Sequence, residues 1–175
     1  MTFYEHLLSR SWAPYLHTWV DWKQEVITFP LWVPGGRLIG YIKYVWGNPK
    51  KRNNGAGGRY FTWVADAYKK CYVYGYDSLF GHGPLFIVEG VWDAIRVQVN
   101  WYDCLATLTA TPTAQTKQWI KFVACGRPVI ALADDDAKLG RRWADIQVLP
   151  INAHDIGDMS RVAVGEMLNN ICKEL

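Results

Sequence analysis

Short apolar segments of strand length alternate with helical patterns in the second half of the chain, and this alternation limits the possible folds more than any other sequence feature. The apolar segments cover residues 84–88, 104–108, 128–133 and 146–151. Helical patterns occupy residues 91–101, begin again at 112–113, recur briefly at 141–144 and resume from 158 or 160. Strands that alternate with helices in this way form a mostly parallel sheet with helices on both faces. Residues 83–175 are therefore expected to form an α/β domain.

The first half of the chain has a different pattern, which is typical of antiparallel strands. Residues 26–33 are rich in β-branched and aromatic side chains, a Pro-Gly-Gly-Arg turn follows, and residues 38–46 alternate again. Residues 47–58 are polar, basic and rich in glycine, which predicts a loop. We expect residues 1–82 to form a small β-rich, basic subdomain.

The two halves also differ in charge. Residues 1–80 hold ten Lys and Arg against five Asp and Glu, whereas residues 81–175 hold nine against eleven, and the whole chain carries +3. Such a division suggests that one half contacts a polyanion while the other holds cations. A chance bias of the surface explains the division equally well.

Cysteine use and hydropathy exclude several other classes of protein. The four cysteines form no Cys-x-x-Cys pair and have no histidine at finger spacing, so neither a zinc site nor a disulfide framework is expected. The first ten residues lack the apolar run of a signal peptide, and no stretch approaches the roughly 20 apolar residues of a membrane span. We expect a cytoplasmic protein with no membrane partner.

Carboxylates follow three of the strands predicted in the second half. Glu89 comes directly after the first, Asp134 and Asp136 come after the third, and Asp155 and Asp158 come after the fourth. Because the carboxyl ends of parallel strands meet at one edge of a sheet, these side chains should converge. Carboxylates that converge repel one another unless a cation neutralises them, and hard oxygen ligands suit Mg²⁺ or Mn²⁺. The pattern predicts a divalent metal site.

Each of these acids also has a simpler interpretation. Asp93 lies in the first turn of the predicted helix at 91–101, where a carboxylate stabilises the positive end of the helix. Asp155 and Asp158 could serve loop solubility or helix capping. Taken together, the Glu-Gly pair after one strand and the Asp-x-Asp after another favour the metal site.

Three segments of the second half resemble the motifs of TOPRIM domains. IVEGVWDAI at 87–95 resembles the Glu-Gly motif, ALADDDAKLGRRWA at 131–144 resembles the Asp-x-Asp motif, and HDIGDMS at 154–160 resembles the acidic segment that follows in primases. FPLWVPGGRLIGYIKY at 29–44 and VYGYDSL at 73–79 are similar to the segments that precede TOPRIM in bacterial and phage DNA primases. The resemblance covers about residues 25–170 and implies a Rossmann-like TOPRIM fold.

The resemblance implies a role for individual residues. Glu89, Asp134 and Asp136 would be catalytic and would hold Mg²⁺ or Mn²⁺, with Asp93 and Asp155 supporting them. Template phosphates would contact basic residues of the first half, namely Lys43, Lys50, Lys51, Arg52 and Arg59. Arg141 and Arg142 would reach nucleotide phosphates, although a solvated helix face explains them equally well.

The family also implies a function, which is the synthesis of short RNA primers from nucleoside triphosphates on single-stranded DNA during phage or bacterial replication. The chain shows no zinc-ribbon motif and no GxxxxGK[ST] helicase motif. A replicative helicase or a separate zinc-binding protein is therefore an expected partner, and a phage-encoded version would act in the host cytoplasm. Two alternatives stay open: a TOPRIM nuclease that uses Glu89 to activate water, and a non-catalytic relative that binds single-stranded nucleic acid or a replication protein.

Overall fold

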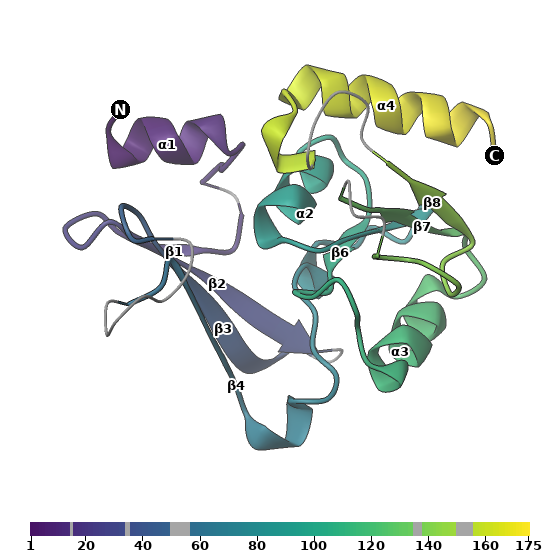
Figure 1. The fold of residues 1–175 in the computed structure, drawn as a ribbon, viewed down its shortest axis with the longest axis horizontal. Helices are drawn as coiled ribbons and strands as arrows, with labels where there is room; N and C mark the ends of the chain where they lie inside the picture. Colours follow the sequence, from purple (N-terminus) through teal and green to yellow (C-terminus); the bar gives the residue numbers. More distant parts are fainter. Residues whose placement is uncertain (15, 34–35, 50–56, 135–137, 150–155) are drawn as a thin grey trace.

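The computed structural model contains two four-stranded sheets, one antiparallel and one parallel (Figure 1). It describes residues 1–175 except 15, 34–35, 50–56, 135–137 and 150–155. The antiparallel sheet has the order β1-β2-β3-β4 and consists of β1 (Trp19–Asp21), β2 (Val26–Val33), β3 (Arg37–Val45) and β4 (Tyr60–Val64). The parallel sheet has the order β6-β5-β7-β8 and consists of β5 (Leu85–Val88), β6 (Cys104–Ala106), β7 (Val129–Leu132) and β8 (Ile146–Val148). The α/β prediction for the second half is confirmed, as is the hairpin in the first half.

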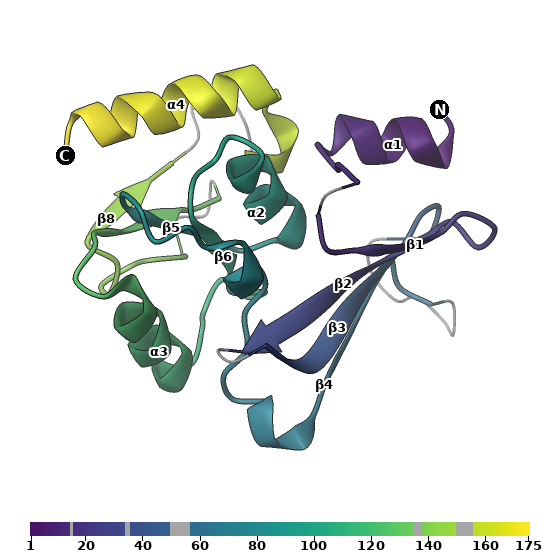
Figure 2. The same cartoon turned by 180° about the vertical axis from the view of Figure 1, so that it is seen from behind.

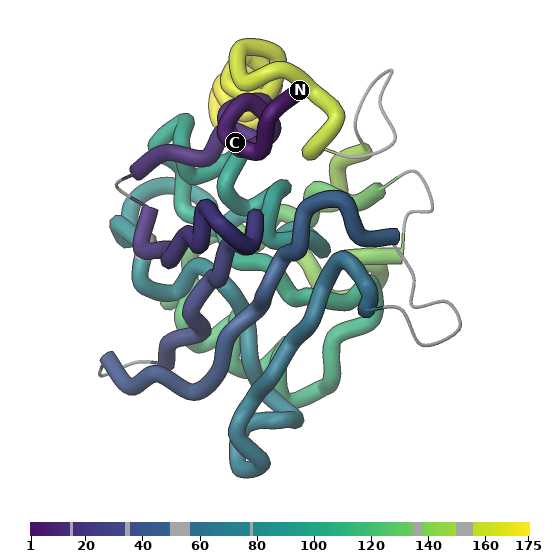
Figure 3. Tube along the Cα trace, turned by 90° about the vertical axis from the view of Figure 1, so that its left-hand side faces the viewer, coloured from purple at the N-terminus to yellow at the C-terminus, as the bar shows by residue number. Residues whose placement is uncertain are grey.

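Within the described residues, four helices surround the sheets: α1 (Phe3–Ser9), α2 (Val91–Gln98), α3 (Ala114–Ala124) and α4 (Arg161–Lys173). Short 3-10 turns lie at η1 (Asp66–Tyr68), η2 (Tyr76–Ser78) and η3 (Ile156–Asp158). Helices α2 and α4 lie on one face of the parallel sheet and α3 on the other, as Figures 1 and 2 show. Helix α1 lies above the antiparallel sheet, at the same end of the molecule as α4 (Figure 3). In the part of the chain that the structure describes, no helix is long and apolar enough to cross a membrane.

Alternate side chains of β5, β6 and β7 enter different cores, as the period of two in a strand requires. Leu85 and Ile87 pack with Ile120 of α3, whereas Phe86 and Val88 pack on the side of α2 and α4. Each of these side chains is almost completely buried. The first three apolar runs of the second half therefore belong to strands that are covered on both faces, whereas β8 is largely exposed.

Aromatic rings join the antiparallel sheet to the parallel unit. Trp92 of α2 lies edge-on to Phe29 at 5.1 Å and to Tyr44 at 5.4 Å between ring centroids, and Phe29 meets Tyr74 at 5.8 Å. Because these buried rings belong to one core cluster, the two halves of the chain pack as a single unit. The division into residues 1–82 and 83–175 stays a prediction.

The helix predicted at residues 141–144 is wrong, because this segment forms a turn. Gly140 has a φ of +77° and Arg142 a φ of +67°, and two left-handed residues in such a short segment interrupt a right-handed helix. Gly140 also lies against the sheet, where an added Cβ would stand only 2.1 Å from the Cβ of Ala131. The turn at Gly140 therefore requires glycine both for its φ and for its close approach to β7.

Candidate active site

The order of the parallel strands creates a crevice between β5 and β7. The chain passes from β5 through α2 to β6, which lies on one side of β5. It then passes through α3, on the opposite face of the sheet from α2, to β7, which lies on the other side of β5. Ligands of open α/β sheets bind at such a switch point, outside the carboxyl ends of the strands. Glu89 follows β5 and Asp134 follows β7 closely, so the topology brings these two predicted residues to the crevice.

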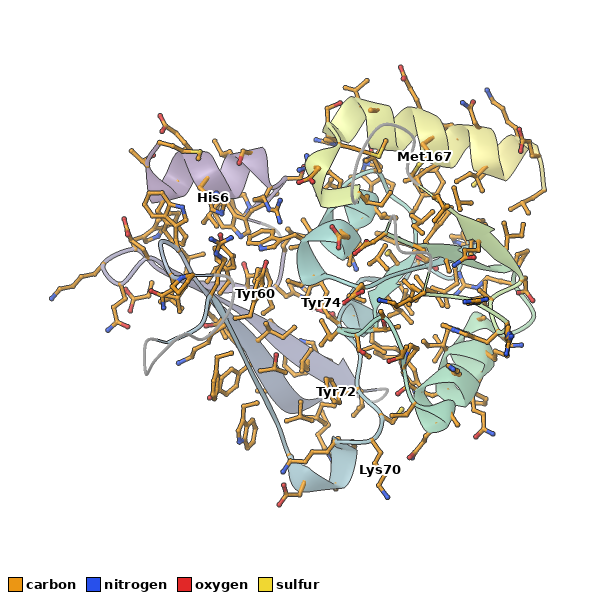
Figure 4. The ribbon with its side chains drawn as sticks, in the orientation of Figure 1. His6, Tyr60, Lys70, Tyr72, Tyr74 and Met167 are labelled. Carbon is orange, nitrogen blue, oxygen red and sulfur yellow. The ribbon has the colours of Figure 1, made fainter. Side chains whose placement is uncertain are left out.

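A cleft of about 460 Å³ opens at this point, between the carboxyl ends of the parallel strands and the inner face of the antiparallel sheet. It is lined by Arg10, Ile42, Arg59, Tyr60 and Thr62 from the first half of the chain and by Glu89, Gly90, Val91, Trp92, Asp93, Leu108, Asp134 and Asp158 from the second. Tyr60 lies between the antiparallel sheet and α2 in Figure 4. Four carboxylates and two guanidinium groups therefore share one cleft.

Backbone hydrogen bonds fix the position of Glu89. The amide of Leu108 donates to the Glu89 carbonyl at 2.9 Å, and the amide of Thr107 donates to the Val88 carbonyl at 3.0 Å. These bonds extend the pairing of β5 with β6 beyond the last residue of each strand. Glu89 therefore stands on backbone that continues β5, a central strand of the parallel sheet.

Asp93 has the helix-stabilising role that its position in the first turn suggested. Its Oδ2 accepts a hydrogen bond from the Gly90 amide at 3.1 Å. A Cβ on Gly90 would stand 2.5 Å from that same oxygen, so a larger residue there would displace the Asp93 carboxylate. The Glu-Gly-x-x-Asp spacing is thus explained by the geometry at the start of α2, and Asp93 also borders the cleft.

The cleft fits a divalent metal by the chemistry of its side chains. Glu89 and Asp134 offer the hard oxygen donors that Mg²⁺ and Mn²⁺ prefer, and Asp93 and Asp158 stand along the same cleft. Among the described residues, no three His, Cys, Asp or Glu side chains are close enough to hold an ion together. Asp136 and Asp155, the other two predicted ligands, lie outside the described residues. The metal site therefore stays a prediction.

Two arginines that the sequence did not single out hold η3 beside the cleft. Arg96 of α2 is buried and donates from one nitrogen to the carbonyls of Ser9 and Gly157, both at 3.0 Å. Arg10 also donates to the Gly157 carbonyl, at 3.5 Å, and its guanidinium lies 5.7 Å from the centroid of the Trp92 ring. These contacts join α1, α2 and η3, and so position Asp158. Nothing in the sequence pattern indicated them.

The predicted basic residues are separated in the structure. Arg59 lines the acidic cleft and donates from Nε to the Asn48 carbonyl at 3.0 Å. Lys43 lies on the outer face of β3, beside Tyr41, because it alternates with Ile42, which faces the cleft. Arg141 and Arg142 line a different pocket, on the side of α3. The remaining three, Lys50, Lys51 and Arg52, lie outside the described residues.

A half-buried histidine packs behind the cleft. His6 of α1, labelled in Figure 4, stacks on Tyr44 with the ring planes 10° apart, and its Nε2 is hydrogen-bonded to the Tyr44 hydroxyl at 2.7 Å. Burial lowers the pKa of His6 below its usual value, and the nearby Arg10 and Arg59 guanidinium groups lower it further. The surroundings of His6 in the folded protein therefore favour the neutral imidazole.

This lowered pKa predicts how stability depends on pH. The unfolded chain protonates His6 at a higher pH than the native protein does, so His6 contributes stability that is complete above the ordinary histidine pKa. That contribution is lost as the pH falls towards the lower native pKa. Thermal unfolding midpoints from pH 8 to pH 5 should fall less steeply for His6→Gln than for the wild type. Parallel curves for the two proteins would contradict the prediction.

Comparisons with known proteins agree with the predicted fold. No protein-family model matches the chain, and no curated protein matches it in sequence. Solved structures do match it. The Aquifex aeolicus primase, with its zinc binding and RNA polymerase domains, has a TM-score of 0.65 and 17% identity, over 98% of this chain and 46% of that one. The E. coli primase catalytic core has a TM-score of 0.65 and 20% identity, over 85% of this chain and 52% of that one.

A phage protein is also similar. The primase fragment of the bacteriophage T7 primase-helicase protein has a TM-score of 0.54 and 13% identity, over 85% of this chain and 60% of that one. This chain spans only about half the length of the Aquifex aeolicus primase structure. Its parallel sheet and helices match the fold of primase catalytic cores, and an antiparallel sheet precedes them. The chain has the fold of primase catalytic cores, as the resemblance of its motifs implied.

Proposed function

We propose that this chain is the catalytic core of a DNA primase, which joins ribonucleotides into short primers on a single-stranded DNA template. The observation that carries the proposal is the meeting of Glu89 and Asp134 in a cleft that Arg10 and Arg59 also line. Acidic side chains suit a metal and basic side chains suit phosphates, and nucleotidyl transfer needs both at one place. The primase-like fold supports the same reaction.

Each residue of the cleft has a chemical task in this proposal. Glu89 and Asp134 would hold Mg²⁺ or Mn²⁺ together with Asp136 and Asp155, and the ion would neutralise charge on the reacting phosphates. The Glu89 carboxylate would accept the proton of the primer 3′ hydroxyl as that oxygen attacks the α-phosphorus of the incoming nucleotide. Pyrophosphate then leaves. Arg10 and Arg59 would bind phosphates from the side of the antiparallel sheet, without reading bases.

Template recognition would come from elsewhere. The similar T7 fragment belongs to a primase-helicase protein, and the similar Aquifex aeolicus structure includes a zinc binding domain. We propose that a helicase or a zinc-binding protein supplies the corresponding function to this chain.

One assay separates primer synthesis from its alternatives. The protein is incubated with single-stranded DNA, labelled nucleoside triphosphates and Mg²⁺ or Mn²⁺, and the products are resolved by length. Short oligomers whose sequence follows the template support a primase. Degradation of the DNA supports a TOPRIM nuclease instead, and binding without either product supports a non-catalytic protein.

The non-catalytic alternative has one observation in its favour. On the outer face of the antiparallel sheet, Phe61 and Trp63 are about half exposed, and Trp63 stacks on Tyr41 with ring centroids 5.7 Å apart. Lys43 lies above Tyr41, with Nζ 5.5 Å from the ring centroid. Exposed aromatic rings with a cation beside them can stack the bases of a single strand. If the protein is a non-catalytic binder of single strands, Trp63→Ala would weaken oligonucleotide binding, whereas Glu89→Gln would not.

A further inference from the structure

Strand β4 forms one edge of the antiparallel sheet, and a groove lies beside it. The strand order places β3 on one side of β4 and no strand of the described residues on the other (Figure 1). The groove has a volume of about 550 Å³ and is lined by residues 61–66 and by Lys69. Four of the five residues of β4 are exposed, and only Val64 is buried. Strand β4 therefore borders space that another chain can enter.

The free edge of β4 carries backbone groups that β3 does not use. In an antiparallel pair, directly opposite residues alternate between those that exchange hydrogen bonds and those that do not. The Ala65 amide, just beyond β4, donates to the carbonyl of the opposite residue, Ile39, at 2.9 Å, which fixes this alternation. Phe61 and Trp63 are therefore the residues of β4 that bond to β3. The amides and carbonyls of the other three residues point away from β3, and these are Tyr60, Thr62 and Val64.

The composition of β4 does not protect this edge. Edge strands commonly avoid pairing with another chain through charged side chains, proline or a very short length. The sequence of β4, Tyr-Phe-Thr-Trp-Val, contains no charge and no proline, and its residue types favour strands. Strand β1, at the opposite edge of the same sheet, is three residues long and ends at Asp21. Of the two edges, β4 is therefore the one suited to accept another strand.

The sequence of β4 is complementary to itself. Antiparallel pairing about Thr62 sets this residue opposite its own copy, and sets Phe61 of each copy opposite Trp63 of the other. Both aromatic side chains are about half exposed on the outer face of the sheet. Aromatic pairs that face each other across two strands stabilise a sheet. A second copy of the strand therefore covers exposed rings at both sides of the Thr62 pair.

Charges at the ends of the paired segment favour the same occupant. In this register Arg59 of each copy comes opposite Ala65 of the other, and Asp66 is the next residue. The Asp66 carboxylate also pairs with Lys69 of its own chain, but its side chain is 91% exposed and so accessible to a second copy. Opposite charges therefore approach at both ends, and no like charges face each other between them.

We propose that β4 is a self-association surface, through which two copies of this chain join their antiparallel sheets into one continuous sheet. The twofold axis passes through the Thr62 pair, perpendicular to the sheet, so both inner faces lie on the same side. Tyr60 and Thr62 also line the acidic cleft, and the second copy extends the wall of each cleft. The association is weak, because Phe61 and Trp63 offer only roughly 100 Å² each, and a stable interface buries at least about 1,200 Å² in all.

The test measures the dissociation constant of the dimer. Sedimentation equilibrium of the full chain covers concentrations from about 1 μM to about 1 mM. Thr62→Pro removes an outward amide and leaves the bonds to β3 in place, because the Thr62 amide does not take part in that pairing. The matched control, Thr62→Val, keeps the amide and the branched side chain and removes only the hydroxyl. We expect proline to weaken the dimer at least about tenfold and valine to change it much less.

Hydrogen exchange of single amides in the wild type needs no variant. The amides of Tyr60, Thr62 and Val64 should become protected as the protein concentration rises, whereas those of Phe61 and Trp63 should be protected at every concentration. If Thr62→Pro does not fold, this measurement decides the question. A chain that stays monomeric over the whole range, exchange at Thr62 that does not depend on concentration, or equal weakening by proline and valine overturns the proposal. Neither measurement involves primer synthesis, so self-association is tested independently of the proposed function.

Discussion

Replacing Glu89 with Gln is expected to lower the rate of templated synthesis by roughly 10³-fold, because it removes the carboxylate that is proposed to hold the cation and to accept the proton of the 3′ hydroxyl. The substitution keeps the size of the side chain and one of its oxygen atoms. The carbonyl of residue 89 still accepts the hydrogen bond from the Leu108 amide, so the end of β5 stays in place. Synthesis is measured as initial rate at saturating nucleotide.

Asp134→Asn is the companion variant, since Asp134 lines the same cleft from beyond β7. If both side chains serve one metal, the double variant should be little slower than either single variant, because residues that act as a unit are not additive. Glu166→Gln on the exposed side of α4 is the matched control for the loss of one carboxylate. Normal synthesis by Glu89→Gln in Mg²⁺ would contradict the assignment of the active site.

The meeting of Glu89 and Asp134 could be predicted because it depends on local pattern. Continuous apolar runs identify buried parallel strands, and the residues that follow such strands gather at one edge of the sheet. Three predicted ligands or supports, Glu89, Asp134 and Asp93, do border one cleft. Ser160 likewise caps α4, where it accepts a hydrogen bond from the Ala163 amide at 3.1 Å.

What the sequence did not reveal depends on contacts between distant parts of the chain. Arg96 binds the carbonyl of Ser9, which is 87 residues away, and no periodicity marks either residue. Arg10 reaches the cleft only because α1 folds back beside α2 and η3. The orientation of Lys43 was within reach of the sequence, since strand alternation places it opposite Ile42, and its contact with template phosphates stays a prediction.

A buried ion pair outside the cleft holds the second half of the chain together. The side chain of Asp103, directly before β6, is fully buried and accepts hydrogen bonds from Arg127 and from the amides of Phe80 and Gly81. Arg127, between α3 and β7, is itself mostly buried and also donates from Nε to the Ala124 carbonyl at 3.0 Å. One carboxylate therefore joins the segment before β5 to the end of α3.

Asp103→Ala should destabilise the protein by about 3–5 kcal/mol, because it leaves a buried guanidinium and two amides without their acceptor. For a chain of this length, such a loss lowers the thermal midpoint by roughly 10 °C. The matched control is Asp66→Ala, which breaks the pair of Asp66 with Lys69, two side chains that are largely exposed. Exposed pairs contribute little, so the control should unfold close to the wild type.

The double variant Asp103→Ala/Arg127→Met shows whether the loss comes from the unpaired charge. Removing the guanidinium as well eliminates the buried charge that Asp103→Ala leaves behind, so the double variant should regain part of the stability. The two amides still lack an acceptor, and recovery should therefore be incomplete. Denaturant unfolding of the four proteins of this cycle measures the coupling. If the two single losses simply add, then Asp103 does not stabilise the fold through Arg127.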